Sequence, residues 1–401
     1  MKKIIEYPEI RMMGYDDAWD YDSMRNLAIF NPKAELPDEF EYVDLESVVG
    51  TEMLSHRKVK RETAPSRAQR LAQYGDLFYQ TVRPYQKNNY LFEKSDKDYV
   101  FSTGYAQLRP SANGYFLLSL VQNNGFVKKV LDNCTGTSYP AINANDLADI
   151  KIYFPSEIRE QEELGSWFRN IDGLISLHQR EIKRLDCVRK AMIDRMFPQG
   201  GADVPAVRFG QYKKPWRLCQ FSEIFTERHI IDTISDEYPQ LAFTIEEGVI
   251  RPEDKKTNKR DFLIIDKATK KYLQTEYDDI IYNPANVIYG AIHRNALGKG
   301  CVSPIYKIFY TDQDSTFMEC IVRHPRFIKE ISRSMEGTVK KLRTLKSKAF
   351  LEMSAYIAPT IEEQQQIGEY FRQMDHLIDI EKEELEKIKH IKSACLEKMF
   401  V

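Results

Sequence analysis

Three short stretches have residue types that could do chemistry, and each lacks a necessary part. The segment YNPAN (282–286) has half of the N-P-P-[YF] pattern with which amino-methyltransferases hold an extruded adenine, without its second proline and aromatic residue. The segment PDEFEY (37–42) begins like a nuclease carboxylate set but has no lysine at the needed spacing. The segment GKG (298–300) is too short for a phosphate-binding loop, and the seven histidines form no H-E-x-x-H zinc motif. We therefore expect no catalytic site and no metal site in this chain.

Basic residues gather in short runs, although the net charge of the 401 residues is only −2. A local basic run, and not the net charge, is the electrostatic footprint of a nucleic-acid partner. In the first half of the chain, the predicted contacts to DNA backbone and grooves are Arg57, Lys58, Lys60, Arg61, Arg67 and Arg70. The segment TVRPYQKN (81–88) adds Arg83 for guanine and Lys87 for phosphate, with Tyr79 and Tyr85 as aromatic neighbours.

The second half of the chain has its own candidates. The glycine-containing segment AIHRNALGKG (291–300) offers His293, Arg294, Asn295 and Lys299, and here arginine suits guanine while asparagine suits adenine. The predicted phosphate ligands are Lys255, Lys256, Lys259, Arg260, Lys340, Lys341 and Arg343. A solvated surface is the alternative interpretation of any one of these residues. As sets they favour contact with DNA.

The elements that must position these residues occur twice. The stretch 164–197 matches the stretch 367–400 at an offset of 203, which aligns Phe168 with Phe371 and Phe197 with Phe400. Upstream, 8–19 and 205–216 share the pattern P-x-[IV]-R-x3-Y-x3-W at an offset of 197. The chain is thus two tandem units, joined by the turn-forming segment PQGGADVP. The middles of the units share little sequence, so a repeated framework carries two different inserts.

Both matching stretches have the apolar spacing of long helices. One position every three or four residues gives a heptad seam: Leu164, Phe168, Ile171, Ile175, Ile182, Leu185, Ile367, Phe371, Met374, Ile378, Leu385 and Ile388. Polar interruptions coincide in the two copies, His178 with Glu381 and Arg189 with Lys392. We predict that the two helices bury their stripes against each other in an antiparallel pair. The alternatives are that each helix packs on its own domain, or that the seam forms an intermolecular coiled coil.

The remaining composition indicates an ordinary globular protein. The chain has no run of eighteen apolar residues, so we expect no membrane contact, and its first residues lack the apolar core of a signal peptide. The six cysteines are scattered without metal-binding spacing. This usage predicts free thiols in a reducing cytoplasm.

The repeated motifs, in the order in which they occur along the two units, resemble those of the specificity (S) subunits of type I restriction-modification systems. The resemblance rests on a P…EQ segment before each helix (155–161 and 359–364), on F-R-x-[IM]-D-x-L-I (168–175 and 371–378), and on the final M-F of each helix. The segments GDLFYQTVRPYQKN (75–88) and VSPIYKIF (302–309) are similar to parts of that family's recognition domains. The resemblance covers nearly the whole chain.

The resemblance implies an α+β fold, in which two globular target-recognition domains are joined by two long helices packed as an antiparallel coiled coil with pseudo-two-fold symmetry. The expected divisions are 1–155 for the first recognition domain, 156–198 for the first helix, 199–358 for the second domain and 359–401 for the second helix. Each domain would read half of a split double-stranded DNA site, and the helices would dock two methyltransferase subunits, which restriction and translocase subunits join. S-adenosylmethionine, ATP and Mg²⁺ are expected on those partners and not on this chain.

Two other interpretations remain open. The chain could be a helical-rod adaptor that joins two protein-binding domains without any role in DNA recognition. Basic runs in both middles argue against the adaptor, because it does not need them twice. A fused enzyme is the third interpretation, and the incomplete catalytic motifs argue against it.

Overall fold

The structure of the chain is a computed structural model that describes residues 7–136, 138–254, 270–335 and 343–401. It contains two compact units: unit 1 comprises residues 1–180 with 382–401, and unit 2 comprises residues 181–381. Each unit contains sheets, short helices and a part of both long helices, α4 (Ile158–Met196) and α8 (Ile361–Lys398). The predicted α+β fold with two sheet-bearing units is confirmed.

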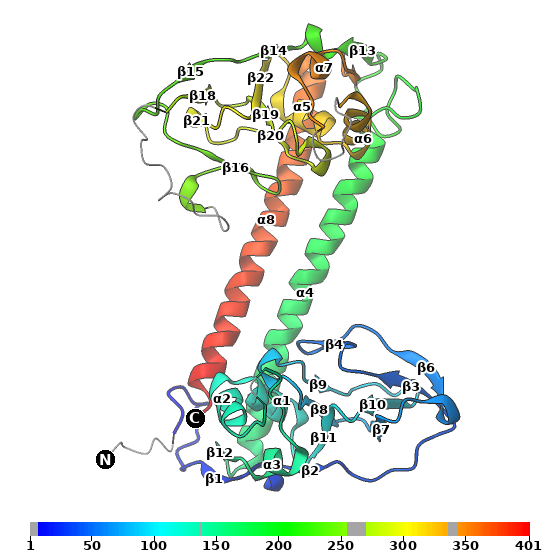
Figure 1. Ribbon diagram of the computed structural model, residues 1–401, viewed down its shortest axis with the longest axis vertical. Coiled ribbons are helices and arrows are strands. Elements are labelled where there is room, and N and C mark those ends of the chain that lie inside the picture. The colour runs from blue at the N-terminus through cyan, green and yellow to red at the C-terminus, as the bar shows by residue number, and fades with distance from the viewer. Residues whose placement is uncertain (1–6, 137, 255–269, 336–342) are drawn as a thin grey trace. The chain divides into compact units, whose positions relative to one another are not determined.

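The long helices run antiparallel to each other within each unit. In unit 1 the beginning of α4 lies beside the end of α8 (Figure 1), and the Nζ atom of Lys392 is 2.5 Å from Oδ1 of Asp172. In unit 2 the equivalent pair is Arg189 with Asp375, whose Nη2 and Oδ2 atoms are 3.0 Å apart. Two of the residues that interrupt the seam, Arg189 and Lys392, therefore form ion pairs between the helices, and the predicted antiparallel direction is confirmed.

The seam side chains face away from solvent over most of both helices. Eight are buried, namely Leu164, Phe168, Ile171, Ile367, Phe371, Met374, Ile378 and Leu385. Four are half-buried, namely Ile175, Ile182, Leu185 and Ile388. Leu164, Phe168 and Ile171 also belong to the core of unit 1, as Ile367 and Phe371 belong to that of unit 2. The beginning of each helix thus packs on its own unit, as one alternative proposed, while also pairing with the other helix.

The final M-F of each helix completes the core of the unit in which that helix ends. The Phe400 ring lies 5.7 Å from Phe168 and 5.9 Å from Phe116 between centroids, inside unit 1. In unit 2 the Phe197 ring lies 6.2 Å from Phe371. Each core therefore contains one phenylalanine from the first turns of one long helix and one from the end of the other. This explains why M-F recurs at both helix ends.

Unit 1 contains two four-stranded sheets and two strand pairs. The first sheet has the order β2 (Ala28–Phe30), β11 (Tyr105–Pro110), β8 (Leu77–Gln80), β9 (Tyr90–Leu91). The second has the order β6 (Arg57–Lys60), β3 (Glu39–Val43), β10 (Tyr99–Ser102), β7 (Ala68–Leu71). The pairs are β1 (Asp20–Ser23) with β12 (Lys151–Phe154), and β4 (Val48–Val49) with β5 (Glu52–Met53). The short helices are α1 (Gly114–Gln122), α2 (Asn124–Asp132) and α3 (Ala144–Asp149).

Unit 2 repeats part of this arrangement. Its four-stranded sheet has the order β14 (Phe225–Glu227), β22 (Lys307–Thr311), β19 (Ile280–Tyr282), β20 (Ile292–Arg294). Its three-stranded sheet has the order β15 (Ile231–Asp232), β18 (Tyr272–Thr275), β21 (Gly300–Val302). The pairs are β13 (Arg217–Gln220) with β23 (Ser354–Ile357), and β16 (Ala242–Thr244) with β17 (Gly248–Ile250). The short helices are α5 (Ser315–Val322), α6 (Pro325–Ser334) and α7 (Ser347–Leu351).

The two units share more structure than their sequences indicate. The sheets β2-β11-β8-β9 and β14-β22-β19-β20, which we call the framework sheets, have the same order and are antiparallel throughout. The middles share little sequence, but this part of their structure is common to both units. Its matching strands LFY (77–79) and IIY (280–282) are fully buried, and buried positions accept one large apolar residue for another.

The remaining sheets, which we call the variable sheets, do differ. In unit 1 the variable sheet is β6-β3-β10-β7 and contains a parallel pair, β10 with β3. In unit 2 it is the antiparallel sheet β15-β18-β21. The inserts that distinguish the units are thus the variable sheets with their loops.

A glycine near the beginning of each long helix allows a short helix to approach closely. A Cβ atom on Gly165 would overlap the side chain of Asn113, which caps α1, and would lie 2.9 Å from the backbone nitrogen of Phe116. A Cβ atom on Gly368 would overlap Asp314, which caps α5. The N-termini of α1 and α5 therefore abut the long helices where no side chain intervenes.

Replacement of these glycines tests this contact. We expect Gly165→Ala to lower the free energy of unfolding by about 1–3 kcal/mol, because the added methyl group must displace the cap of α1. The matched control is Gly173→Ala in the same helix, where a Cβ atom meets nothing within 4 Å. Alanine should stabilise that position by roughly 0.5–1 kcal/mol. Denaturant unfolding measures both, and equal stability of the two variants would contradict the close approach.

Candidate nucleic-acid interface

The first basic run lies at one edge of the variable sheet of unit 1. Arg57, Lys58 and Lys60 are exposed on the edge strand β6, and Arg61 follows in the 3₁₀ turn η2 (Arg61–Thr63). The Nζ atom of Lys58 is 2.6 Å from Oε2 of Glu39 on the neighbouring strand. Four cations along an edge strand and the adjacent turn can follow a phosphate backbone, because phosphate contacts require charge and reach.

Two further arginines lie at the opposite edge of the same sheet, in or next to strand β7. Arg67 is exposed just before β7, and Arg70 is half-buried within it. The Nε atom of Arg70 is enclosed without a hydrogen-bond partner in the described part of the chain, and burial lowers the pKa of its guanidinium. A cation that is partly desolvated without a carboxylate partner gains strongly from an incoming anion. Arg70 therefore suits a phosphate contact.

The second candidate segment of unit 1 packs within the framework. Tyr79 is fully buried on β8, edge-on to Phe126 at 6.0 Å, so its predicted contact with DNA is wrong. The Nζ atom of Lys87 donates to the carbonyl oxygen of Gln122 at 2.8 Å, and burial lowers the pKa of this ammonium group. Lys87 therefore stabilises the junction of α1 and α2 in this structure.

Arg83 and Tyr85 of the same segment are more accessible. Arg83 has a left-handed backbone with φ of 56°, directly before the turn η3 (Pro84–Gln86), and its guanidinium lies 4.4 Å from the ring of Tyr139. Tyr85 is half exposed. For these two residues DNA contact stays a prediction.

The candidate segment of unit 2 is mostly internal. His293 is 3% exposed and its Nε2 atom is 2.8 Å from the carbonyl oxygen of Ile245. Asn295 is fully buried, and its amide group donates to the carbonyl oxygens of Glu276 and Gly298 at 2.9 and 2.7 Å. The predicted base contacts of His293 and Asn295 are wrong, because His293 is bonded to the turn between β16 and β17 and Asn295 to the loop after β20.

The cations near this loop are paired with carboxylates. The Nη1 atom of Arg294 is 2.8 Å from Oδ1 of Asp278, its Nε atom is 3.5 Å from Oε2 of Glu319, and the side chain is only 12% exposed. Lys299 pairs with Glu237 at the surface. Guanine recognition by Arg294 would require release from two carboxylates.

Most of the predicted phosphate ligands of unit 2 lie outside the described residues, namely Lys255, Lys256, Lys259, Arg260, Lys340 and Lys341. Arg343 is described and exposed, and it precedes α7. For these seven residues phosphate binding stays a prediction.

Beneath the candidate interface, a buried carboxylate anchors the opening segment of unit 1. Glu160, in the first turn of α4, is 1% exposed and accepts two hydrogen bonds of 2.8 Å from the guanidinium of Arg11. The indole nitrogen of Trp19 donates to the same carboxylate at 3.3 Å. Arg11 also donates to the carbonyl oxygen of Asp17. We call this arrangement the carboxylate clamp.

Unit 2 has the same clamp. Glu363 in α8 is fully buried, and the guanidinium of Arg208 donates to its two oxygens at 2.6 and 2.8 Å. The indole nitrogen of Trp216 donates to it at 3.2 Å. The sequence contained the signal, since arginine, tryptophan and glutamate recur in both copies. Because some 150 residues separate the opening pattern from the glutamate, the sequence alone does not reveal that they meet.

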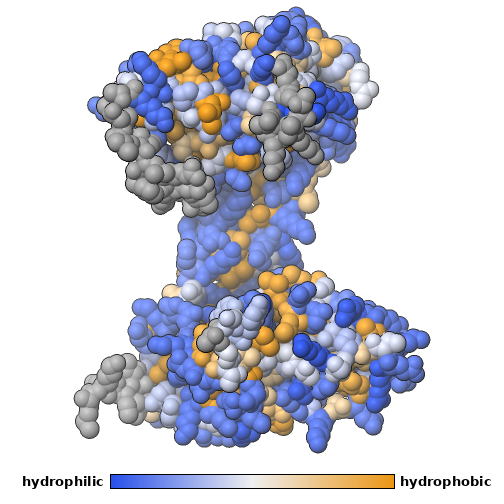
Figure 2. All heavy atoms as spheres, viewed as in Figure 1, coloured by the Kyte–Doolittle hydropathy of each residue, from blue (hydrophilic) through white to orange (hydrophobic). Residues whose placement is uncertain are grey.

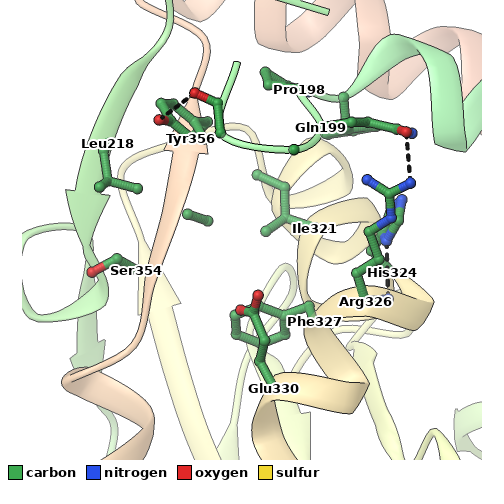
Figure 3. Close-up of a pocket in the computed structure, with 14 residues that line it drawn as sticks. Pro198, Gln199, Leu218, Ile321, His324, Arg326, Phe327, Glu330, Ser354 and Tyr356 are labelled. Carbon is green, nitrogen blue, oxygen red and sulfur yellow. Dashed lines mark hydrogen bonds between the residues drawn. The ribbon is translucent and has the colours of Figure 1, made fainter. Parts of the chain in front are cut away.

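Unit 2 also contains a cavity of about 260 Å³ at the end of α4 (Figure 3). Its lining includes Leu218, Ile321 and Phe327, and also Gln199, which accepts a hydrogen bond of 2.6 Å from Arg326. The labelled side chains include His324, whose Nδ1 atom accepts a bond from the backbone of Arg326 at 3.2 Å. This mixed lining suits an apolar side chain and offers no nucleophile with a base beside it.

The described residues contain neither a metal-binding cluster nor a membrane-spanning helix. No group of three histidine, cysteine, aspartate or glutamate side chains there could hold a metal ion. No helix in that part of the chain is long and apolar enough to cross a membrane. All six cysteines are free thiols, as predicted.

Comparison with known proteins shows what this chain is similar to. Residues 66–186, from the variable sheet of unit 1 into α4, match the family model described as the type I restriction modification DNA specificity domain. The chain carries a type I specificity domain. The specificity subunit of the type I restriction enzyme MjaVIII from Methanocaldococcus jannaschii is 22% identical over 303 residues, which span 70% of this chain and 68% of that protein.

Solved structures show the same fold over nearly the whole chain. The type I restriction-modification S subunit from M. genitalium has a TM-score of 0.63 at 15% identity, covering 98% of this chain and 99% of its own. A chain from a structure of complex assembly and conformational transition of the type I R-M system has a TM-score of 0.53 at 19% identity, covering 94% and 96%. The predicted resemblance to type I specificity subunits is confirmed.

The burial of His293 in unit 2 has a consequence for stability. Desolvation, helped by the nearby Arg323 cation, lowers the pKa of His293 to about 4. The unfolded chain has a histidine pKa of about 6.5, so it binds the proton more readily than the folded chain between these values. Unit 2 should therefore lose about 3 kcal/mol of stability as the pH falls from about 6.5 to about 4.

The variant His293→Gln should unfold with a weaker dependence on pH over that range, because glutamine cannot take up the proton. The exposed His376→Gln in α8 is the matched control and should retain the full dependence. Chemical unfolding at a series of pH values measures both. An identical pH dependence in the two variants would contradict the buried neutral imidazole.

Proposed function

We propose that this chain is the non-catalytic DNA sequence-specificity subunit of a type I restriction-modification complex. Each unit reads one half of a bipartite, asymmetric site in double-stranded DNA. The long helices set the spacing between the halves and dock two methyltransferase subunits. Restriction and translocase subunits join that complex, and S-adenosylmethionine, ATP and Mg²⁺ belong to those partners.

The observation that carries this proposal is that the two units have the same framework sheet but different variable sheets. The framework sheets and the carboxylate clamps match between the units, whereas the variable sheets differ in strand number and direction. In unit 1 the variable sheet has the exposed cations of β6 along one edge. A protein that reads two unrelated half-sites needs two different surfaces on equivalent supports. This arrangement meets that need.

Docking of two copies of one partner is supported by apolar residues that are exposed at equivalent positions. Leu174 of α4 is 50% exposed and its counterpart Leu377 of α8 is 49% exposed. Leu177 and Ile380 form a second such pair, at 54% and 40%. Figure 2 shows apolar side chains at the surface of the helical segments. Exposed apolar surface that recurs at equivalent positions is typical of an interaction site.

The salt dependence of DNA binding tests the proposal. We expect the complex of this chain with its methyltransferase subunit to bind duplex DNA less tightly as salt rises, because binding releases counterions from the phosphates. Lys60→Ala should weaken binding by a similar factor on every sequence. It should also reduce the slope of log affinity against log salt by about one.

Lys183→Ala is the matched control, since this lysine is exposed on α4 and belongs to neither variable sheet. It should leave the slope unchanged. Gel-shift titrations at several salt concentrations measure all three proteins. A complex that assembles but does not bind duplex DNA even at low salt would favour the adaptor interpretation instead.

A further inference from the structure

Each unit has a groove in the same place, between the opening segment and the first turns of a long helix. The groove of unit 1 measures about 510 Å³ and is lined by Met12, Glu162, Glu163 and Trp167, among others. The groove of unit 2 measures about 450 Å³ and is lined by Phe209, Glu362, Glu369 and Tyr370. Trp167 and Tyr370 correspond at the offset of 203, and Met12 and Phe209 at the offset of 197.

The carboxylate clamps build these grooves. Met12 directly follows the clamp arginine of unit 1, and Phe209 directly follows Arg208 in unit 2. Because each clamp fixes its arginine against the helix, the next side chain is held at the groove wall. The helix supplies the rest of the lining, from the residue directly before the clamp glutamate to nearly three turns after it. The grooves are therefore rigid features and not accidents of a loop.

The two grooves share their chemistry. Each has an accessible aromatic face, with Trp167 42% exposed and Tyr370 half-buried. Each is acidic: the lining of unit 1 has two glutamates against Arg159, and that of unit 2 has two glutamates and no cation. An aromatic face beside carboxylates suits an arginine or lysine side chain, which stacks its stem and charge on the ring and faces the acids.

The grooves continue into the exposed apolar residues of the helices. Trp167, Leu174 and Leu177 are separated by seven and three residues, which places them on one face of α4. Tyr370, Leu377 and Ile380 have the same spacing on α8. A partner seated along this face would meet the groove at one end and an apolar stripe beyond it. Because the same groove and apolar stripe occur on both helices, two copies of the same partner can bind, one to each unit.

We propose that each groove receives an arginine- or lysine-bearing segment with apolar flanks from one methyltransferase subunit, one copy per unit. This inference rests on the proposed function and identifies where its docking occurs. Trp167 and Tyr370 are the anchoring contacts, and the glutamates of the grooves select the positive charge.

The variants Trp167→Ala and Tyr370→Ala test the two grooves separately. With a purified cognate methyltransferase subunit, the unaltered chain should bind two copies. Each single variant should bind one copy normally and the other at least about tenfold more weakly, because a buried aromatic anchor dominates such contacts. The double variant should weaken both. Titration calorimetry and native mass spectrometry measure affinity and stoichiometry.

The control variants are Tyr74→Ala and Tyr289→Ala, which remove tyrosines that are 67% and 68% exposed away from the grooves. Both should bind two copies with unchanged affinity. Unfolding curves confirm that every variant is folded, and the exposed substitution Glu162→Lys gives a second test that does not remove an aromatic residue. It should slow association with unit 1 at low salt, and this effect should fade at high salt.

The outcomes separate the two proposals. If the unaltered chain binds two methyltransferase subunits and the double variant binds both equally well, the groove inference is overturned while the proposed function stands. Unchanged association of Glu162→Lys would likewise overturn the charge selection. If the unaltered chain binds none, the docking part of the proposed function fails together with the grooves.

Discussion

The fold depends on a carboxylate that is buried at the beginning of each long helix. A buried carboxylate is strongly destabilising unless it is paired and hydrogen-bonded. Glu160 and Glu363 meet this requirement through a two-pronged arginine and an indole from a segment that lies far away in sequence. The clamp therefore fixes the opening segment against the helix. The strand that follows each opening segment then pairs with the strand before the helix.

A second constraint joins the two helices. Each unit contains the beginning of one long helix and the end of the other, so that Phe400 completes the core of unit 1 and Phe197 that of unit 2. Loss of a buried phenylalanine side chain typically costs about 3–5 kcal/mol. The ion pairs of Asp172 with Lys392 and of Asp375 with Arg189 set the direction of the pairing at equivalent positions. Unit 1 therefore needs the C-terminal end of α8 to complete its core, whereas unit 2 is contiguous in sequence and takes parts of both long helices from residues 181–381.

The sequence was informative wherever a periodic pattern reports burial. The heptad seam predicted both helices and their antiparallel pairing, and the coincident charges marked the ion pairs. It was less informative for the framework sheets, since short buried strands such as 77–79 and 280–282 keep their register while exchanging leucine, phenylalanine and isoleucine. The sequence led to wrong predictions of DNA contacts where polar side chains are buried. The histidine and asparagine of H-R-N (293–295) have the right chemistry for base contacts, but nothing in the local sequence reveals that backbone carbonyls already occupy them.

The most direct test of the account is the adenine methylome of cells that co-express this chain with its methyltransferase subunit. The account predicts a split motif, with two short specified blocks around an unspecified gap, which disappears when this chain is omitted. Exchange of residues 20–150 for those of a relative should then change one block and leave the other intact. Methylation without any such motif, from a complex shown to assemble, would contradict the claim that the two units read two half-sites.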